Sequence, residues 1–218
     1  MNHQEILSLC DHTNLNPRAG LDDIKKLIDE GIKYGCASVC IPPTHVYGAA
    51  KYSGGKIPVC TVIGFPNGYM TSRVKAYETE DAIASGANEI DMVINLGMLQ
   101  DRVYKDIARD IEACRKASSG YVLKVIIECC LLSENEKKVL CRIVSESGAD
   151  FIKTSTGFST GGATREDVAL MRENCFPELK IKAAGGIRSF VDAQDFINLG
   201  ADRLGTSRLV KIMEEGIL

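Results

Sequence analysis

The sequence predicts an α/β fold in which eight βα units close into a parallel (β/α)₈ barrel, and two observations lead to this prediction. A weak repeat at residues 35–38, 86–89, 148–151 and 200–203 ends a helical stretch and begins a strand each time. Its copies start 51, 62 and 52 residues apart, which is about the length of two βα units. Strict alternation of strand and helix implies a parallel sheet, open or closed. Eight units favour the closed TIM barrel, although 218 residues is short for one.

The strands are expected where short apolar runs are bounded by turn residues. These runs lie at residues 9–13, 38–41, 59–63, 89–95, 123–128, 151–154, 180–184 and 203–205. Helical periodicity fills the segments between them, most clearly near residues 21–28, 103–111 and 191–199. Ser133 with Glu136, and more loosely Thr164 with Asp167, resemble capping boxes at helix starts. A glycine fits the left-handed position after a helix end, which explains the first residue of each repeat copy.

Length and composition predict one domain over residues 1–218, without a linker or low-complexity tract. The net charge of −3 gives no electrostatic reason to expect nucleic acid or an anionic membrane as a partner. The first residues lack the basic and apolar regions of a signal peptide, and no apolar run reaches transmembrane length. A cytoplasmic location is therefore expected.

Nine cysteines raise the question of a zinc site or a disulfide framework. No Cys-x-x-Cys spacing occurs, the number is odd, and the chain has only three histidines. Several of the cysteines, such as Cys40 and Cys60, lie in apolar strand runs, where a free cysteine acts as a small hydrophobic residue. We expect neither a metal site nor structural disulfides.

Two lysines stand inside predicted strands, and a glycine-rich turn follows each of them. Lys153 lies in the run FIKTSTG and Lys182 in the run IKAAGG. Taking an ammonium group out of water costs several kcal/mol, so a buried lysine tends to lose its proton. A neutral lysine can form a Schiff base with a carbonyl compound, and a second cation nearby favours the neutral form. The pair therefore predicts carbonyl chemistry.

Chemistry in such a barrel takes place at the carboxyl ends of the strands. Asp11 and Thr13 lie at this end of the first strand, and the two lysines come from neighbouring strands whose side chains can meet. Asp91 lies in the fourth strand between apolar residues, and it either relays protons or only pairs with a lysine. Lys124 stands at the start of its strand, so we expect it to be a solvated structural lysine near the opposite face.

Two glycine turns indicate a phosphate site. Gly185-Gly186-Ile187 and Gly205-Thr206-Ser207 follow the seventh and eighth strands, where barrels commonly hold phosphate, and Gly157 adds a third edge. One such turn is more often just a tight loop, whereas two at this position indicate anion binding. A Schiff-base lysine beside a phosphate site suggests a phosphorylated aldose or ketose as the substrate.

Four segments together resemble the deoxyribose-phosphate aldolase family: DHTNL at residues 11–15, EIDMV at 89–93, FIKTSTGF at 151–158 and KAAGGIR at 182–188. The resemblance implies a class I aldolase that uses neither metal nor cofactor. Such a lyase reversibly cleaves 2-deoxy-D-ribose 5-phosphate to D-glyceraldehyde 3-phosphate and acetaldehyde in deoxyribonucleotide catabolism. A homo-oligomer, either a dimer or a tetramer, is compatible with the resemblance.

The resemblance also assigns roles to residues. It implies that Lys153 forms the Schiff base and that Lys182 and Asp91 form a proton relay. The expected substrate-binding residues are Asp11, Thr13, Cys40, Thr156, Gly157, Gly185, Gly186, Gly205 and Ser207. Two departures stand out: Phe158 replaces a phosphate-contacting lysine of some members, and the sequence ends at Leu218 without the C-terminal tyrosine that some members use.

Two alternatives remain open. One is another Schiff-base barrel, such as a transaldolase-like or ketose-bisphosphate aldolase, although the second basic phosphate site of the latter is not evident. The other is a non-catalytic phosphosugar-binding barrel, which would have no need of two buried lysines beside a carboxylate.

Overall fold

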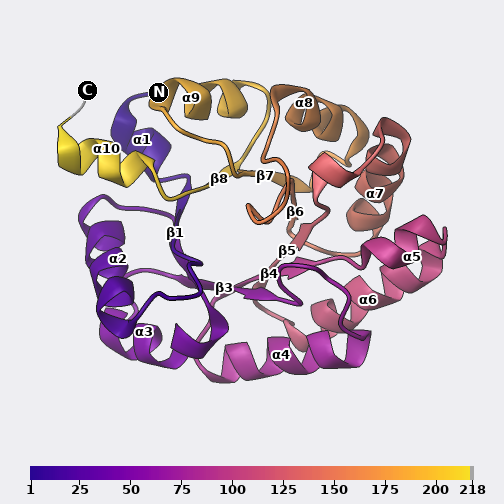
Figure 1. Ribbon diagram of the computed structural model, residues 1–218, viewed down its shortest axis with the longest axis horizontal. Coiled ribbons are helices and arrows are strands. Elements are labelled where there is room, and N and C mark those ends of the chain that lie inside the picture. Colours follow the sequence, from indigo (N-terminus) through magenta and orange to yellow (C-terminus); the bar gives the residue numbers. More distant parts are fainter. Residues whose placement is uncertain (217–218) are drawn as a thin grey trace.

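The computed structural model describes residues 1–216 and confirms the predicted barrel (Figure 1). Each strand pairs in parallel with the next one in sequence, and β8 pairs with β1 to close the sheet. The strands are β1 (Cys10–Thr13), β2 (Ser38–Ile41), β3 (Val59–Ile63), β4 (Glu89–Val93), β5 (Val122–Ile126), β6 (Phe151–Lys153), β7 (Lys180–Ala184) and β8 (Arg203–Thr206).

Helices surround the sheet on its outer side, as Figure 1 shows. They are α1 (His3–Leu7), α2 (Leu21–Lys33), α3 (Val46–Ser53), α4 (Ser72–Ala84), α5 (Leu96–Gln100), α6 (Tyr104–Ala117), α7 (Glu134–Glu146), α8 (Arg165–Asn174), α9 (Phe190–Asn198) and α10 (Leu209–Glu215). Two 3₁₀ turns, η1 (Pro43–His45) and η2 (Cys129–Leu131), follow β2 and β5. Among the described residues, no helix is both long and apolar enough to span a membrane.

The helix starts predicted at Ser133 and Thr164 are confirmed. Ser133 is the N-cap of α7 and forms a full capping box with Glu136, while the Thr164 hydroxyl accepts a hydrogen bond from the Asp167 N–H. The repeat glycines take positive φ values, for example 59° at Gly35 and 75° at Gly148. The short helices α1 and α5 were not foreseen, because each has only five residues and too few turns to show a period.

Two strand ends differ from the prediction for local reasons. β4 ends at Val93 rather than at residue 95, because the Asn95 side chain caps α5 by accepting from the N–H groups of Gly97 and Met98. β5 ends at Ile126 rather than at residue 128, because Glu128 takes a left-handed conformation with φ 56°. The other expected strands agree with the structure to within one residue at each end.

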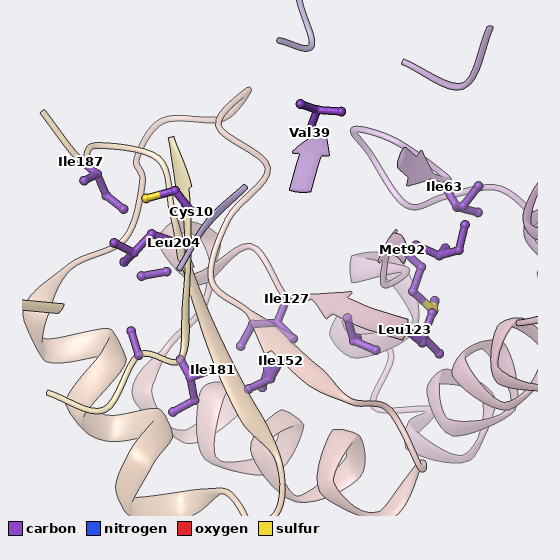
Figure 2. Close-up of a cluster of buried hydrophobic side chains, with 14 of the residues drawn as sticks. Cys10, Val39, Ile63, Met92, Leu123, Ile127, Ile152, Ile181, Ile187 and Leu204 are labelled. Atoms are coloured by element: carbon purple, nitrogen blue, oxygen red, sulfur yellow. The ribbon is translucent and has the colours of Figure 1, made fainter. Parts of the chain in front are cut away.

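Side chains alternate between the two faces of the sheet, and the two faces differ in chemistry. Outward-facing residues such as Met92, Ile152 and Ile181 pack under the helices in one continuous apolar core (Figure 2). The residues between them point into the barrel, and many of these are charged. A small apolar cluster of Cys40, Cys60 and Val62 fills part of the barrel interior on the β2–β3 side.

Candidate active site

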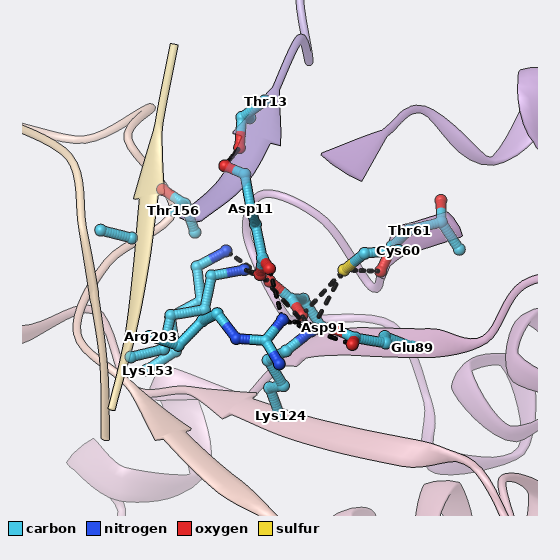
Figure 3. A network of polar contacts seen from close by, with 12 residues as sticks. Asp11, Thr13, Cys60, Thr61, Glu89, Asp91, Lys124, Lys153, Thr156 and Arg203 are labelled. Carbon is cyan, nitrogen blue, oxygen red and sulfur yellow. Dashed lines mark hydrogen bonds and ion pairs between the residues drawn. The ribbon is translucent and has the colours of Figure 1, made fainter. Parts of the chain in front are cut away.

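Asp91 of β4 lies at the centre of a charged cluster inside the barrel (Figure 3). Its Oδ2 is 2.7 Å from the Nζ of Lys153 and 2.7 Å from the Nζ of Lys182. Its Oδ1 is 2.8 Å from the Nζ of Lys124. All four side chains are almost completely removed from solvent. Strands β4, β5, β6 and β7 thus direct one carboxylate and three ammonium groups to the same point.

Two more carboxylates complete the cluster. Asp11 of β1 contacts the Nζ of Lys182, and its Oδ1 accepts a hydrogen bond of 2.6 Å from Arg203 of β8. Glu89 of β4 lies 2.6 Å from Lys124 and 3.2 Å from Arg203. The interior therefore holds three carboxylates and four basic groups, and each carboxylate contacts at least two of these groups.

The contacts set the protonation of the cluster. Burial alone would raise the pKa of Asp91, but the ammonium groups of Lys124, Lys153 and Lys182 outweigh it and hold this pKa well below its ordinary value. The pKa of Asp11 is lowered in the same way, against burial, by its basic neighbours. Burial would lower the pKa of Lys182, yet Asp11 and Asp91 outweigh burial and raise it. Both carboxylates are therefore ionised, and Lys182 is a cation.

The prediction for Lys124 was wrong. Its side chain is fully buried, and the pKa of Lys124 is raised well above its ordinary value because nearby anions, Asp91 first, outweigh burial. The register explains its position, since Lys124 is the direct cross-strand partner of Asp91 and faces the same side of the sheet. Lys124 belongs to the central cluster rather than to a solvated face.

Sequence reasoning also missed Glu89, Arg203 and Cys60. The Sγ of Cys60 is 3.2 Å from Asp91 Oδ1 and 3.3 Å from Lys124 Nζ, so this thiol is part of the polar network. A usable signal existed, because Glu89 and Asp91 alternate with apolar residues as inward-facing positions of one strand do. Arg203 could be placed only after closure, because its contact with Asp11 joins residues 192 positions apart.

A cavity of about 790 Å³ opens above this cluster, at the carboxyl ends of β1, β6, β7 and β8. Lys153 lines the cavity while its Nζ contacts Asp91, so this lysine connects the cavity to the buried charges. Of the predicted substrate-binding residues, the cavity wall contains Thr13, Thr156, Gly157, Gly185, Gly186, Gly205 and Ser207.

Four predicted residues lie outside the cavity wall. Asp91, Lys182 and Asp11 belong to the buried cluster, and none of them has more than a trace of exposed surface. Cys40 of β2 lies opposite Cys60 of β3 in the strand register, and both free cysteines belong to the small apolar cluster. The structure thus separates an open cavity wall from a buried charged layer, and Lys153 touches both.

Two sets of side chains inside the barrel come close enough for metal ligation, namely Cys40, Cys60 and Asp91, and Asp11, Cys60 and Glu89. In both sets the carboxylates already contact ammonium or guanidinium groups at hydrogen-bond distance. These basic groups would repel an added cation, so we assign no metal to either set.

Comparison with known proteins identifies the family. Residues 6–207 match the family model described as DeoC/LacD family aldolase. A deoxyribose-phosphate aldolase of Clostridioides difficile (strain 630) is 51% identical over 211 residues, covering 97% of this chain and 96% of the relative. One of Clostridium perfringens (strain 13 / Type A) is 52% identical over 216 residues, covering 98% and 96%. The chain belongs to the DeoC/LacD family of aldolases.

Solved structures of the family agree with the barrel. A protein described as QR15, an aldolase, is 37% identical and superposes with a TM-score of 0.93, covering 98% of this chain and 96% of the other. A deoxyribose phosphate aldolase of Aeropyrum pernix, described as having a unique tetrameric structure, is 33% identical with a TM-score of 0.90, covering 99% and 92%. The resemblance seen in the sequence motifs is therefore confirmed.

The burial of Lys124 generates a stability prediction. Lys124→Met should lower the free energy of unfolding by about 3–5 kcal/mol, because it leaves buried carboxylates without a counter-charge. Urea titration measures this loss, and the exposed Lys116→Met should stay within about 0.5 kcal/mol of the wild type. A Lys124→Met protein as stable as the Lys116 control would contradict the assignment.

The same variant should change the response to acid. The folded pKa of Asp91 lies below its unfolded value of about 3.9, so its stabilising effect is present above that pH and is lost as the pH falls further. Lys124→Met removes one of the cations that lower this pKa. The loss of stability on acidification below pH about 4 should therefore be smaller in the variant than in the wild type.

Proposed function

We propose that the protein is a class I deoxyribose-phosphate aldolase, which reversibly cleaves 2-deoxy-D-ribose 5-phosphate to D-glyceraldehyde 3-phosphate and acetaldehyde. The observation that carries this proposal is the position of Lys153, which lines the cavity and contacts Asp91 within the buried cluster. Relatives at about half identity over nearly the whole chain bear the name of this activity.

The charge balance of the cluster supports Lys153 as the nucleophile. Four basic side chains face three carboxylates, so the release of one proton would balance the cluster. Lys124, Lys182 and Arg203 each contact two or more carboxylates, whereas Lys153 contacts only Asp91. Lys153 is therefore the basic residue of the cluster with the fewest ion pairs, and its amine is the one that faces the cavity.

The cleavage reaction follows from these positions. The amine of Lys153 adds to the aldehyde carbon of the open-chain sugar, and loss of water gives an iminium ion. This cation withdraws electrons from the bond between carbons 2 and 3. Removal of the proton from the hydroxyl on carbon 3 then releases glyceraldehyde 3-phosphate and leaves an enamine on Lys153. Protonation of the enamine and addition of water free acetaldehyde.

We assign the proton transfers to Lys182 and Asp91. Both contact the same point as the Lys153 amine, since Asp91 Oδ2 lies 2.7 Å from each lysine. The lowered pKa of Asp91 makes it a weak base on its own, whereas the raised pKa of Lys182 keeps a proton stored beside it. In this assignment Asp91, through a water molecule, accepts the proton of the carbon 3 hydroxyl, and Lys182 donates the proton that converts the enamine to an iminium ion. Proton transfer from Asp91 to Lys182 then restores both groups.

The phosphate end is assigned to the glycine loops in the cavity wall. Gly185 and Gly186 have φ values of 78° and 79°, which L side chains rarely adopt. Gly185 is also packed tightly, because a Cβ there would lie 3.0 Å from the Gly162 Cα. Backbone N–H groups of these loops, with the Ser207 hydroxyl, would bind the phosphate. Phe158 offers no cation and packs edge-on against Phe65 with ring centroids 5.3 Å apart.

Two cations at the cavity can offset the absence of a lysine at position 158. Lys26 of α2 and Lys211 of α10 both line the cavity. We assign them a long-range role in attracting the phosphate dianion rather than a fixed contact. We also propose that the enzyme works as one domain in the cytoplasm, as a homo-oligomer, with no nucleic-acid or membrane partner and no bound metal or cofactor.

The alternatives explain fewer of the observations. A non-catalytic binding barrel gives no reason to bury seven charged groups beneath the cavity. Another Schiff-base barrel could use the same lysine, but the family membership favours the deoxyribose-phosphate reaction.

Trapping the intermediate tests the nucleophile. Borohydride added with acetaldehyde should reduce the imine and leave a two-carbon addition on Lys153, which peptide mass spectrometry can locate. Lys153→Arg should carry no addition at this position. Labelling of Lys182 or Lys124 while Lys153 stays unmodified would overturn the assignment.

Replacing Lys182 tests the proton relay. Lys182→Met should lower kcat by a factor of about 10² or more, because general acid–base catalysis contributes at least that much. Borohydride trapping at Lys153 should persist, since the nucleophile remains, and this separates loss of proton transfer from loss of folding. Turnover near that of the wild type would make Lys182 a bystander.

A charge at Ser207 tests the phosphate site. Ser207→Asp would place an anion against the phosphate, and two charges about 5 Å apart at a dielectric near 20 repel by roughly 3 kcal/mol before screening. The KM for 2-deoxyribose 5-phosphate should rise about tenfold or more, while turnover of unphosphorylated deoxyribose should barely change. Ser119→Asp, on an exposed loop before β5, is the matched control. Equal losses on both sugars would remove the phosphate from these loops.

A further inference from the structure

Glu128, two residues beyond the end of β5, has an unusual combination of backbone and side-chain properties. Its φ of 56° and ψ of 62° are left-handed, and within residues 1–216 only Arg102 shares a positive φ among residues other than glycine. Its side chain is buried, with 3% of the residue exposed. Glycine would adopt this backbone more easily, and a buried carboxylate loses its hydration. The position is therefore unfavourable for glutamate unless the carboxylate has a task.

The carboxylate binds one residue of the loop that follows Lys153. Its Oε1 accepts a hydrogen bond of 3.1 Å from the Thr156 N–H, and its Oε2 accepts a hydrogen bond from the Thr156 hydroxyl. The Thr156 Oγ1 in turn accepts a hydrogen bond of 3.0 Å from the Phe158 N–H. Glu128 thus uses both oxygens to fix the main chain and the side chain of Thr156, and Thr156 passes the constraint to Phe158.

Backbone contacts on both sides of Glu128 hold this arrangement in place. The Ile127 N–H donates to the Lys153 carbonyl at 3.1 Å, and the Cys129 N–H donates to the Thr154 carbonyl at 2.8 Å. The left-handed residue between them turns its carboxylate towards Thr156. The same short stretch therefore ties down the Schiff-base strand through its backbone and the following loop through one side chain.

The loop that Glu128 fixes is in contact with the rest of the cavity wall. Thr156 and Gly157 both line the cavity. The Gly157 Cα lies 3.7 Å from the point where a Cβ of Gly185 would stand, so the loop packs against the first glycine of the assigned phosphate site. A shift of Thr156 would displace Gly157 and alter the place where the phosphate end would bind.

We propose that Glu128 is a positioning residue for phosphorylated substrates, acting through Thr156 to hold the loop of residues 154–158 against the glycine turn at Gly185. The proposal rests on the function proposed above. Glu128 itself does not line the cavity, so its effect on the substrate is indirect. The chain keeps glutamate at a position suited to glycine because only a long carboxylate supplies both acceptors to Thr156.

Three variants test the proposal. Glu128→Gly keeps the backbone conformation and removes the carboxylate, whereas Glu128→Gln keeps the shape but replaces one acceptor by a donor. Arg102→Gly is the matched control, because it relieves the same backbone conformation at an exposed position between α5 and α6. All are assayed with 2-deoxyribose 5-phosphate and with unphosphorylated deoxyribose.

In Glu128→Gly the KM for the phosphorylated sugar should rise about tenfold or more, with a smaller rise in Glu128→Gln and none in Arg102→Gly. Turnover of unphosphorylated deoxyribose should change less than KM does. The KM of the double variant Glu128→Gln with Thr156→Val should be no higher than that of Thr156→Val alone, because both changes remove the hydrogen bond from the Thr156 hydroxyl to Glu128. A KM unchanged in Glu128→Gly, losses equal on both sugars, or losses that multiply in the double variant would overturn the proposal.

Amide hydrogen exchange separates failure of this proposal from failure of the proposed function. The Thr156 amide should exchange about tenfold faster or more in Glu128→Gly than in the wild type, and at the wild-type rate in Arg102→Gly. A wild-type protein that does not cleave 2-deoxyribose 5-phosphate would end the proposed function, and the positioning of substrate by Glu128 would fall with it. A wild-type protein that cleaves the sugar, with Thr156 exchange unchanged in Glu128→Gly, would end the positioning role alone.

Discussion

The contact of the Asp91 carboxylate with three lysines in the buried interior of the barrel is the interaction on which the rest of the structure depends. Each partner is buried because the others are present, since an isolated charge in this environment would be far less stable than in water. Arg203 compensates the buried charges of Asp11 and Glu89 in the same way, so the network of ion pairs continues around the barrel. Removing one member would leave its partners uncompensated, so the stability of the fold rests on the same groups to which we assign the chemistry.

Barrel closure is what brings these groups together. The cluster takes residues from β1, β4, β5, β6, β7 and β8, and no segment of the chain contains more than two of them. Direct cross-strand pairing places Lys124 beside Asp91 and Lys153 beside Lys182, so register determines the order of charges across the sheet. Above this layer the wall changes to glycine loops, which can bind an anion through the backbone without adding charge. The barrel thus stacks a densely charged buried layer under a cavity wall in which glycine loops lie beside a few charged side chains, among them Lys26 and Lys211.

Much of this arrangement could be predicted from sequence, and the exceptions have physical causes. Lys153, Lys182 and Asp91 were found because each interrupts an apolar strand run, and the barrel followed from the repeat spacing. The prediction for Lys124 was wrong because a residue near the start of its strand was expected to reach solvent, whereas the register with Asp91 directs its side chain into the barrel. Arg203 and Glu128 act through contacts between distant segments, which a single sequence does not display. Asp11 and Cys40 were expected to line the substrate pocket, yet both are buried and neither lines the cavity. Their depth along the strand, which residue type does not indicate, determines whether they reach the cavity.

The charge balance also bears on the course of the proposed reaction. With a neutral Lys153, three cations face three carboxylates, and the same balance holds in the enamine, which carries no charge on its nitrogen. The iminium ions that precede and follow the enamine restore a fourth positive charge at this position. The cluster therefore favours the step that converts iminium to enamine, because that step removes the surplus charge from a site with little water to screen it. Asp91 has the opposite effect, because its carboxylate contacts the Lys153 nitrogen directly and stabilises the positive charge of the iminium ion. One carboxylate shared by several lysines can thus hold both intermediates close in energy, which a single lysine–carboxylate pair, with no surplus charge to remove, would not do.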